Sequence, residues 1–303
     1  MHDIVIAGAG PAGLSAGIYG ARAGLDVLIV ERLFAGGQIA NTKILENYPG
    51  LDPIDGPNFA FKLGEQAKKA GAKIIYDQIT DFSLEGNEKT IQGAKRAYQG
   101  KTVILSMGAY PRGLGILAEQ KFSSRGLSYC ATCDGSLYRD KTVAVAGGGD
   151  TAVEDALYLA NLAKKVYIIH RRDQFRAQAT LQQLLSANGV IEQVLNSTVV
   201  DLAGGEFLEK VIVEDKNTSK RREIPADALF IAIGRIPDTE ALPYARMKDE
   251  QGYLLTDETM KTYIPGVYAA GDIRKKQLRQ VVTAAADGAL AASMAAQYIL
   301  SLS

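Results

Sequence analysis

Gly8-Ala9-Gly10-Pro11-Ala12-Gly13 decides the fold of this chain, because it joins an apolar strand-like segment to a helix-like one. The strand-like segment is Asp3-Ile4-Val5-Ile6-Ala7, and the helical pattern runs from Leu14 to Ala23. A second apolar run, Val27-Leu28-Ile29-Val30, then ends at Glu31. This order is typical of a βαβ nucleotide-binding unit, whose glycine turn lets a pyrophosphate approach the backbone at a helix N-terminus.

The same arrangement occurs a second time. Val143-Ala144-Val145-Ala146 precedes Gly147-Gly148-Gly149-Asp150-Thr151-Ala152, a helical pattern covers residues 152–163, and Val166-Tyr167-Ile168-Ile169 ends at His170. The first glycine lies 23 residues before the strand-end residue in both copies. A single glycine motif is weak, but its repetition in the same context predicts an α/β fold with two Rossmann-like dinucleotide-binding domains.

The strand-end residues distinguish the two ligands. Glu31 is an acceptor suited to the ribose hydroxyls of FAD or NAD. The second copy instead has His170-Arg171-Arg172, with Arg176 one helical turn later, and guanidinium groups bind a 2′-phosphate well. We therefore expect NADPH at the second site. Two alternatives stay open, namely a solvated basic surface run and His170 as a general base.

A Gly-Asp pair near the C-terminus favours FAD at the first site. Val267-Tyr268-Ala269-Ala270 leads into Gly271-Asp272, and a long helix is expected from about Leu278 to Leu300. Asp272 can accept a hydrogen bond from a ribityl or phosphate-linked hydroxyl, and the helix N-terminus can stabilise a reduced flavin anion. The alternative is an ordinary Gly-Asp turn.

Both cysteines of the chain lie in Cys130-Ala131-Thr132-Cys133, which Asp134 follows. Zinc would need two more ligands, and the only histidines are His2 and His170, so no metal is expected and a redox dithiol is favoured. Asp134 is the candidate acid/base for the dithiol protons. The alternative for Asp134 is a helix N-cap, and the two roles can coexist.

Composition excludes several other classes of protein. The 303 residues are 47% hydrophobic and their formal net charge is +0, so no bulk charge favours nucleic acid or an acidic membrane. The longest apolar stretch near the N-terminus, residues 4–10, is too short for a membrane span or signal sequence. We therefore expect a cytoplasmic protein.

Taken together, these segments resemble the bacterial-type, low-molecular-weight thioredoxin reductases, which are class II pyridine nucleotide-disulfide oxidoreductases. The resemblance covers essentially the whole chain, and its most specific segments are Cys130 to Gly135 and His170 to Ala177. Gly36-Gly37-Gln38, Glu46 to Gly50 and Arg279-Gln280 also contribute. One departure is Ser136-Leu137-Tyr138, which replaces an aromatic pair plus tyrosine after the cysteine pair.

The resemblance implies a discontinuous FAD-binding domain, residues 1–112 and 239–303, into which an NADPH-binding domain, residues 113–238, is inserted. It implies a homodimer and an inserted domain that rotates between two orientations. Electrons would pass from NADPH through FAD to the cysteine pair, with Cys133 facing the flavin and Cys130 attacking the disulfide of thioredoxin or a similar small redox protein. The alternatives are a ferredoxin-dependent relative and a non-catalytic regulator that binds FAD and NADPH.

The motifs and the resemblance together give three sets of candidate site residues. The catalytic set is Cys130, Cys133 and Asp134. The FAD set is Gly8, Gly10, Pro11, Ala12, Gly13, Glu31, Gly37, Gln38, Asn47, Gly108, Gly271, Asp272, Arg279 and Gln280. The NADPH set is Gly147, Gly149, Asp150, Thr151, Ala152, His170, Arg171, Arg172, Arg176 and Gly234.

Overall fold

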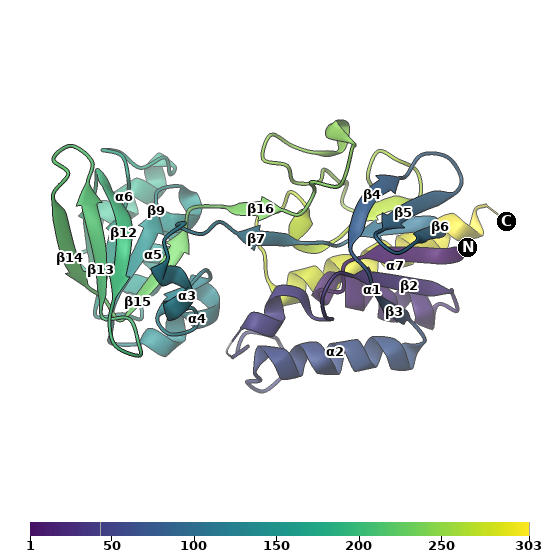
Figure 1. The fold of residues 1–303 in the computed structure, drawn as a ribbon, viewed down its shortest axis with the longest axis horizontal. Coiled ribbons are helices and arrows are strands. Elements are labelled where there is room, and N and C mark those ends of the chain that lie inside the picture. The colour runs from purple at the N-terminus through teal and green to yellow at the C-terminus, as the bar shows by residue number, and fades with distance from the viewer. Residues whose placement is uncertain (43, 303) are drawn as a thin grey trace. The chain divides into compact units, whose positions relative to one another are not determined.

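The chain forms two compact units in a computed structural model that describes residues 1–42 and 44–302. Unit 1 comprises Met1–Tyr110 and Ile236–Ser303, and unit 2 comprises Pro111–Arg235. The connecting strands β7 (Ala109–Pro111) and β16 (Arg235–Pro237) pair with each other (Figure 1). Unit 2 is thus inserted into unit 1, in line with the predicted α/β architecture. The contacts place the boundaries two and three residues before the positions expected from the sequence.

Unit 1 is built on a seven-stranded sheet with the order β3-β2-β1-β6-β5-β4, in which β17 also pairs with β6. The strands are β1 (His2–Ala7), β2 (Val27–Glu31), β3 (Lys73–Tyr76), β4 (Ile79–Ser83), β5 (Lys89–Gly93), β6 (Ala97–Leu105) and β17 (Val267–Ala269). β1, β2, β3, β6 and β17 run parallel, whereas β4 and β5 form an antiparallel extension. Residues 4–7 of β1 and 27–30 of β2 are buried, as expected for parallel strands covered on both faces.

Two helices from opposite ends of the chain pack against each other in unit 1. These are α1 (Pro11–Arg22) and α7 (Val281–Leu300), and α2 (Gly56–Ala70) packs on the other side of α1 (Figure 1). A Cβ atom at Gly288 would lie 2.0 Å from the carbonyl oxygen of Ala12. The hydroxyl of Ser15 also donates to the carbonyl of Ala285 at 2.7 Å. The lack of a side chain at residue 288 therefore permits the close approach of α1 and α7.

The predicted helix starts need small corrections. α1 begins at Pro11 instead of Leu14, because proline fits the first helical position, where no N–H donor is required. α5 (Asp150–Ala160) likewise begins before the predicted Ala152. α7 begins at Val281 instead of about Leu278, since Gln280 and Thr283 form a reciprocal capping box there.

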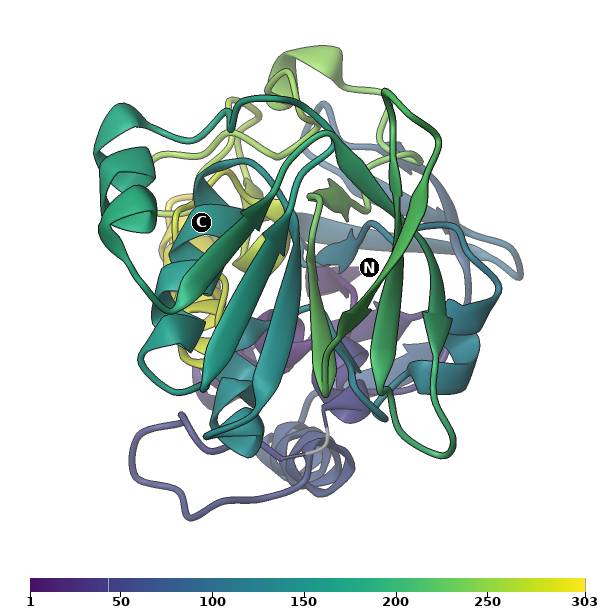
Figure 2. The ribbon, with the colours of Figure 1, turned by 90° about the vertical axis from the view of Figure 1, so that its left-hand side faces the viewer.

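Unit 2 contains a five-stranded parallel sheet and a three-stranded antiparallel sheet (Figure 2). The parallel order is β11-β10-β9-β15-β8, made of β8 (Leu127–Ser128), β9 (Thr142–Gly147), β10 (Lys165–Ile169), β11 (Ile191–Val194) and β15 (Ala228–Ala232). The antiparallel strands are β12 (Ser197–Ala203), β13 (Lys210–Asp215) and β14 (Arg221–Pro225). One hydrophobic core joins the parallel sheet to α5 and α6 (Ala179–Ala187), and another joins it to the antiparallel strands.

The remaining described helices of unit 2 are short. They are α3 (Ala118–Phe122), α4 (Ala131–Asp134) and η2 (Gly135–Tyr138), while unit 1 adds η1 (Gly37–Asn41), η3 (Ala245–Met247) and η4 (Gly271–Ile273). Within residues 1–42 and 44–302, no helix combines the length and the apolar character that crossing a membrane requires.

The packing of α1 on α7 predicts opposite effects for two glycine substitutions. Gly288→Ala should destabilise unit 1 by about 1–3 kcal/mol, because the new methyl group overlaps backbone atoms that cannot yield easily. Gly64→Ala in α2 should be neutral or stabilise by up to about 1 kcal/mol, since its Cβ would meet only the Ala35 methyl group, at 3.6 Å. Thermal unfolding followed by circular dichroism checks both variants. Equal melting temperatures for the two would contradict the proposed packing constraint.

Candidate functional site

The glycine loop between β1 and α1 packs tightly against the protein backbone on one side and leaves free space on the other. Gly8 has φ +96°, and a Cβ there would lie 2.7 Å from the Ser106 carbonyl oxygen. A Cβ at Gly13 would lie 1.9 Å from the Gly8 carbonyl oxygen, whereas a Cβ at Gly10 would meet nothing within 4 Å. The first turn of α1 carries no acidic residue and no side-chain cap, so its N–H groups face an open space suited to a pyrophosphate.

Glu31 lies at the end of β2 and reaches this loop. Its carboxylate accepts hydrogen bonds from the backbone N–H groups of Ala9 at 2.7 Å, Arg32 at 2.8 Å and Leu33 at 3.1 Å. The predicted ribose acceptor and the phosphate-binding turn are therefore adjacent, which fits the adenosine half of a dinucleotide.

Other predicted FAD residues are also neighbours within unit 1. Gly37 approaches Gly10, since a Cβ at Gly37 would lie 3.1 Å from the Gly10 Cα. The Asn47 amide donates to the side-chain oxygen of Gln280 at 3.1 Å. Further contacts are Gln38 Nε2 donating to the Ala109 carbonyl, Arg279 Nε donating to the Asp272 carbonyl at 3.5 Å, and Arg279 lying 4.2 Å from the ring centre of Tyr253. Gly108 has φ +77°, next to the connecting strand β7.

Asp287 on α7 holds the Gly271-Asp272 turn and was not predicted from the sequence. Its carboxylate accepts from the Gly271 N–H at 3.0 Å and is paired with Arg274 at 3.0 Å and Lys276 at 2.7 Å. The three charged side chains are 11–12% exposed, so the pairing is weakly screened by solvent. Asp287 is the only charged residue of α7, and no motif or spacing in the sequence links it to residues 271–276.

The loop between β9 and α5 repeats the geometry of the first loop. A Cβ at Gly147 would lie 2.4 Å from the Ala232 carbonyl oxygen and 2.6 Å from the Ala152 Cβ, whereas a Cβ at Gly149 would meet nothing within 4 Å. Asp150, in the first turn of α5, accepts hydrogen bonds from the backbone and side chain of Gln178. Thr151 is exposed and Gly234 has φ +112°.

His170 is buried beneath this second loop. A Cβ at Gly148 would lie 2.1 Å from His170 Nδ1, and the imidazole stacks on Phe175 with ring centres 5.3 Å apart. Burial, followed by the charge of Arg176, lowers the pKa of His170 and favours the neutral ring. Its Nε2 atom is buried, which is unfavourable for the alternative role as a general base. Arg171, Arg172 and Arg176 are exposed, as phosphate ligands need to be.

Cys130 and Cys133 form a disulfide with a Cα–Cα distance of 5.3 Å. Cys130 precedes α4, and Asp134 is the last residue of that one-turn helix. The Asp134 carboxylate accepts from the Ser128 hydroxyl at 2.6 Å. Asp134 also occupies the N-cap position of the following helix η2, but its side chain makes no capping hydrogen bond there.

The Glu119 side chain holds Tyr129, the residue before Cys130. The sequence did not predict this contact. The Glu119 carboxylate accepts from the N–H groups of three successive residues, 114–116, at 2.8–3.2 Å and from the Tyr129 hydroxyl at 3.1 Å. Burial and the nearby Glu119 raise the pKa of Tyr129 to about 12, so its hydroxyl remains a donor. The redox turn is thereby attached to the first segment of unit 2.

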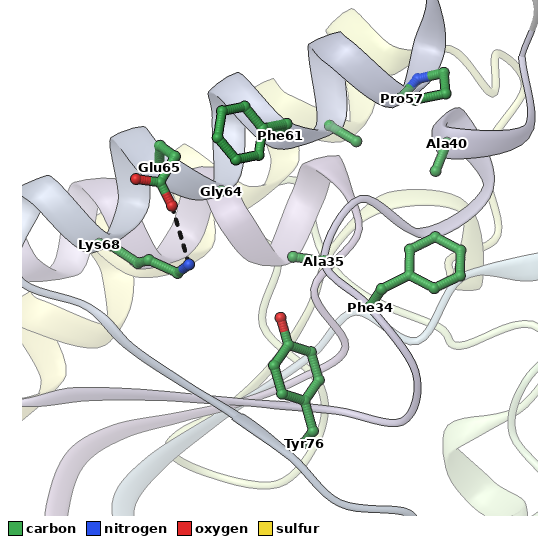
Figure 3. Close-up of a pocket in the computed structure, with 10 residues that line it drawn as sticks. Phe34, Ala35, Ala40, Pro57, Phe61, Gly64, Glu65, Lys68 and Tyr76 are labelled. Carbon is green, nitrogen blue, oxygen red and sulfur yellow. Dashed lines mark hydrogen bonds and ion pairs between the residues drawn. The ribbon is translucent and has the colours of Figure 1, made fainter.

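An apolar cavity of about 360 Å³ lies elsewhere in unit 1, against α2 (Figure 3). Phe34, Phe61 and Tyr76 line it, and the ion pair between Glu65 and Lys68, 3.0 Å apart, borders it. None of the predicted site residues lines this cavity. It therefore plays no part in the site described above.

Comparison with known proteins gives the family. Residues 2–288 match the pyridine nucleotide-disulphide oxidoreductase family. The chain belongs to this family. A thioredoxin reductase of Peptoclostridium acidaminophilum is 43% identical over 99% of this chain and 97% of its own length, and one of Treponema pallidum is 44% identical over 98% and 97%. The crystal structure of thioredoxin reductase from Streptococcus pyogenes is 41% identical, covers 99% of both chains and has a TM-score of 0.94.

Family membership confirms the resemblance noted from the sequence and the predicted cofactors, FAD and NADPH. The two glycine loops fit these cofactors, since each leaves an open face at a helix N-terminus. The assignment of individual residues to each cofactor stays a proposal.

The exposed arginines beyond β10 predict a strong preference for NADPH over NADH. Replacing both Arg171 and Arg176 with glutamine should raise the NADPH KM about a hundredfold or more, because each lost charge-assisted hydrogen bond costs about 1.5–3 kcal/mol. The NADH KM should change little. Arg125→Gln, at an exposed arginine of the same unit, is the control. Equal kcat/KM for NADPH and NADH in the parent protein would overturn this assignment.

Proposed function

We propose that this chain is an NADPH-dependent thioredoxin reductase, which passes electrons from NADPH through FAD and the Cys130–Cys133 pair to a disulfide of thioredoxin. The observation that carries the proposal is the Cys130–Cys133 disulfide in the unit that also contains the second nucleotide-binding loop. The relatives named thioredoxin reductase match over nearly the whole chain, which supports this substrate.

Each part of the chain has a defined task in this reaction. The open loop at Gly10 would hold the FAD pyrophosphate, with Glu31 at a ribose. The open loop at Gly149 would hold the NADPH pyrophosphate, with the arginines at the 2′-phosphate. A FAD held at the first loop would supply the two-electron chemistry that links NADPH oxidation to reduction of the Cys130–Cys133 disulfide.

The reduced cysteine pair then exchanges with the partner. The Cys130 thiolate attacks one sulfur of the thioredoxin disulfide, which forms a mixed disulfide and releases a partner thiolate. Cys133 attacks the Cys130 sulfur, which releases the second partner thiolate and restores the Cys130–Cys133 disulfide. Asp134 moves protons between the dithiol and the leaving thiolates. The two electrons of the dithiol thus end in the thioredoxin dithiol.

The alternatives are disfavoured by particular residues. A ferredoxin-dependent enzyme would not require the second glycine loop together with Arg171, Arg172 and Arg176, all of which are present. A regulator without turnover would not require the redox disulfide. We also propose a cytoplasmic homodimer: the dimer follows the family resemblance, and a reducing relay belongs in a compartment that keeps thiols reduced.

The two cysteines should show unequal roles. Cys133→Ser leaves Cys130 able to attack but without a resolving thiol, so it should trap a mixed disulfide with a thioredoxin that lacks its own resolving cysteine. Cys130→Ser should trap little partner. Non-reducing electrophoresis and mass spectrometry of the adducts measure the difference.

Stopped-flow absorbance supplies the control for both variants. Reduction of FAD by NADPH should continue at close to the parent rate, since this step precedes the thiol chemistry. Thioredoxin turnover at the parent rate by the double variant Cys130→Ser, Cys133→Ser would refute the relay. Parent protein that uses reduced ferredoxin, and not NADPH, would establish the ferredoxin-dependent alternative.

A further inference from the structure

Ser128 is a buried hydroxyl beside the redox turn, to which the reaction described above assigns no role. It is 4% exposed and ends β8, the edge strand of the parallel sheet. β8 pairs with β15, and Ser128 lies opposite Phe230 in that ladder. The residue is therefore fixed by the sheet, only two positions before Cys130.

The Ser128 hydroxyl contacts both ends of the redox turn. It donates to Asp134 Oδ2 at 2.6 Å and accepts from the Cys130 N–H at 3.1 Å. The Cys130 carbonyl oxygen is farther away, at 3.3 Å. A hydroxyl has one proton to donate, and a carboxylate at 2.6 Å is the stronger acceptor. Ser128 thus connects the Asp134 carboxylate to the Cys130 backbone through a single oxygen atom.

Asp134 needs such an anchor because its own helix is short. α4 has one turn, whose backbone hydrogen bonds include those from the Cys133 and Asp134 N–H groups to the Cys130 carbonyl, at 3.3 and 3.1 Å, and one from the Gly135 N–H to the Ala131 carbonyl. A one-turn helix restrains a terminal side chain poorly. The sheet, through Ser128, adds a restraint on the Asp134 carboxylate that does not depend on α4.

We propose that Ser128 is a positioning residue for thioredoxin reduction, which holds the Asp134 carboxylate at the redox turn for proton transfer to and from the dithiol. This inference rests on the proposed function. Ser128 does not exchange protons itself; it acts through Asp134. Loss of its hydroxyl releases the carboxylate from the sheet, so the steps that move dithiol protons slow while the earlier transfer from NADPH to FAD does not change.

The test separates these two halves of the reaction. Ser128→Ala should reduce thioredoxin turnover about tenfold. This loss is smaller than the roughly 10²- to 10⁴-fold that a general acid/base contributes, because Asp134 itself is still present. Stopped-flow reduction of FAD by NADPH should stay near the parent rate in the same preparation, which also reports that the protein is folded and loaded. Ser128→Thr keeps the hydroxyl and should recover most of the lost turnover. Ser197→Ala, at another buried serine of unit 2, is the control and should turn over like the parent.

A double-mutant cycle distinguishes positioning from general loss of stability. In an Asp134→Asn background, Ser128→Ala should cause little further loss, because the group that Ser128 positions has already been removed. Losses that multiply in the double variant would overturn the proposal, as would parent-like turnover of Ser128→Ala. A parent protein that cannot reduce thioredoxin with NADPH would instead refute the proposed function itself.

Discussion

Both proposed nucleotide-binding loops contain a glycine at which the backbone packs so closely that a side chain would not fit. At Gly13 and at Gly147, a Cβ would lie 1.9 Å and 2.4 Å from a carbonyl oxygen of the adjoining loop or strand. The helix that follows each loop can therefore begin directly against the end of its strand. Gly10 and Gly149 complete the arrangement on the outer side, where a Cβ would meet nothing. The cofactor sites, and hence the electron relay, depend on these close approaches.

The redox turn is held in a different way, by side chains instead of close backbone contact. Ser128 ties Asp134 to the edge of the parallel sheet, and Glu119 ties Tyr129 to the first residues of unit 2. Both contacts converge on the residues just before Cys130. A turn that must break and re-form a disulfide during each cycle thus has fixed flanks, although α4 itself is a single turn.

The features that the sequence predicted are those with a repeating pattern. Two glycine loops at equal spacing indicated both dinucleotide-binding units, and two cysteines separated by two residues indicated the redox pair. Helix starts were less accurate, because Pro11 and Asp150 were read as part of the preceding turn. His170 was assigned to the NADPH site together with the arginines that follow it, and the sequence did not predict that its imidazole lies buried under Gly148, where only the space left by a missing Cβ admits it. Ser128, Glu119 and Asp287 act through contacts with residues that only the tertiary structure identifies, and no spacing rule marks them.

The order of the segments along the chain also determines which unit can fold first. Unit 2 is one continuous segment, so it can close while the rest of the protein is still being synthesised. Unit 1 cannot, because β17 pairs with the end of β6 and α7 covers α1, and both elements follow unit 2 in the chain. Until these two elements are synthesised, α1 lacks its packing partner α7 and the end of β6 lacks its neighbour β17. The Gly271-Asp272 turn and Gln280, which we assign to FAD, also follow unit 2, so the proposed FAD site is completed only with the last part of the chain.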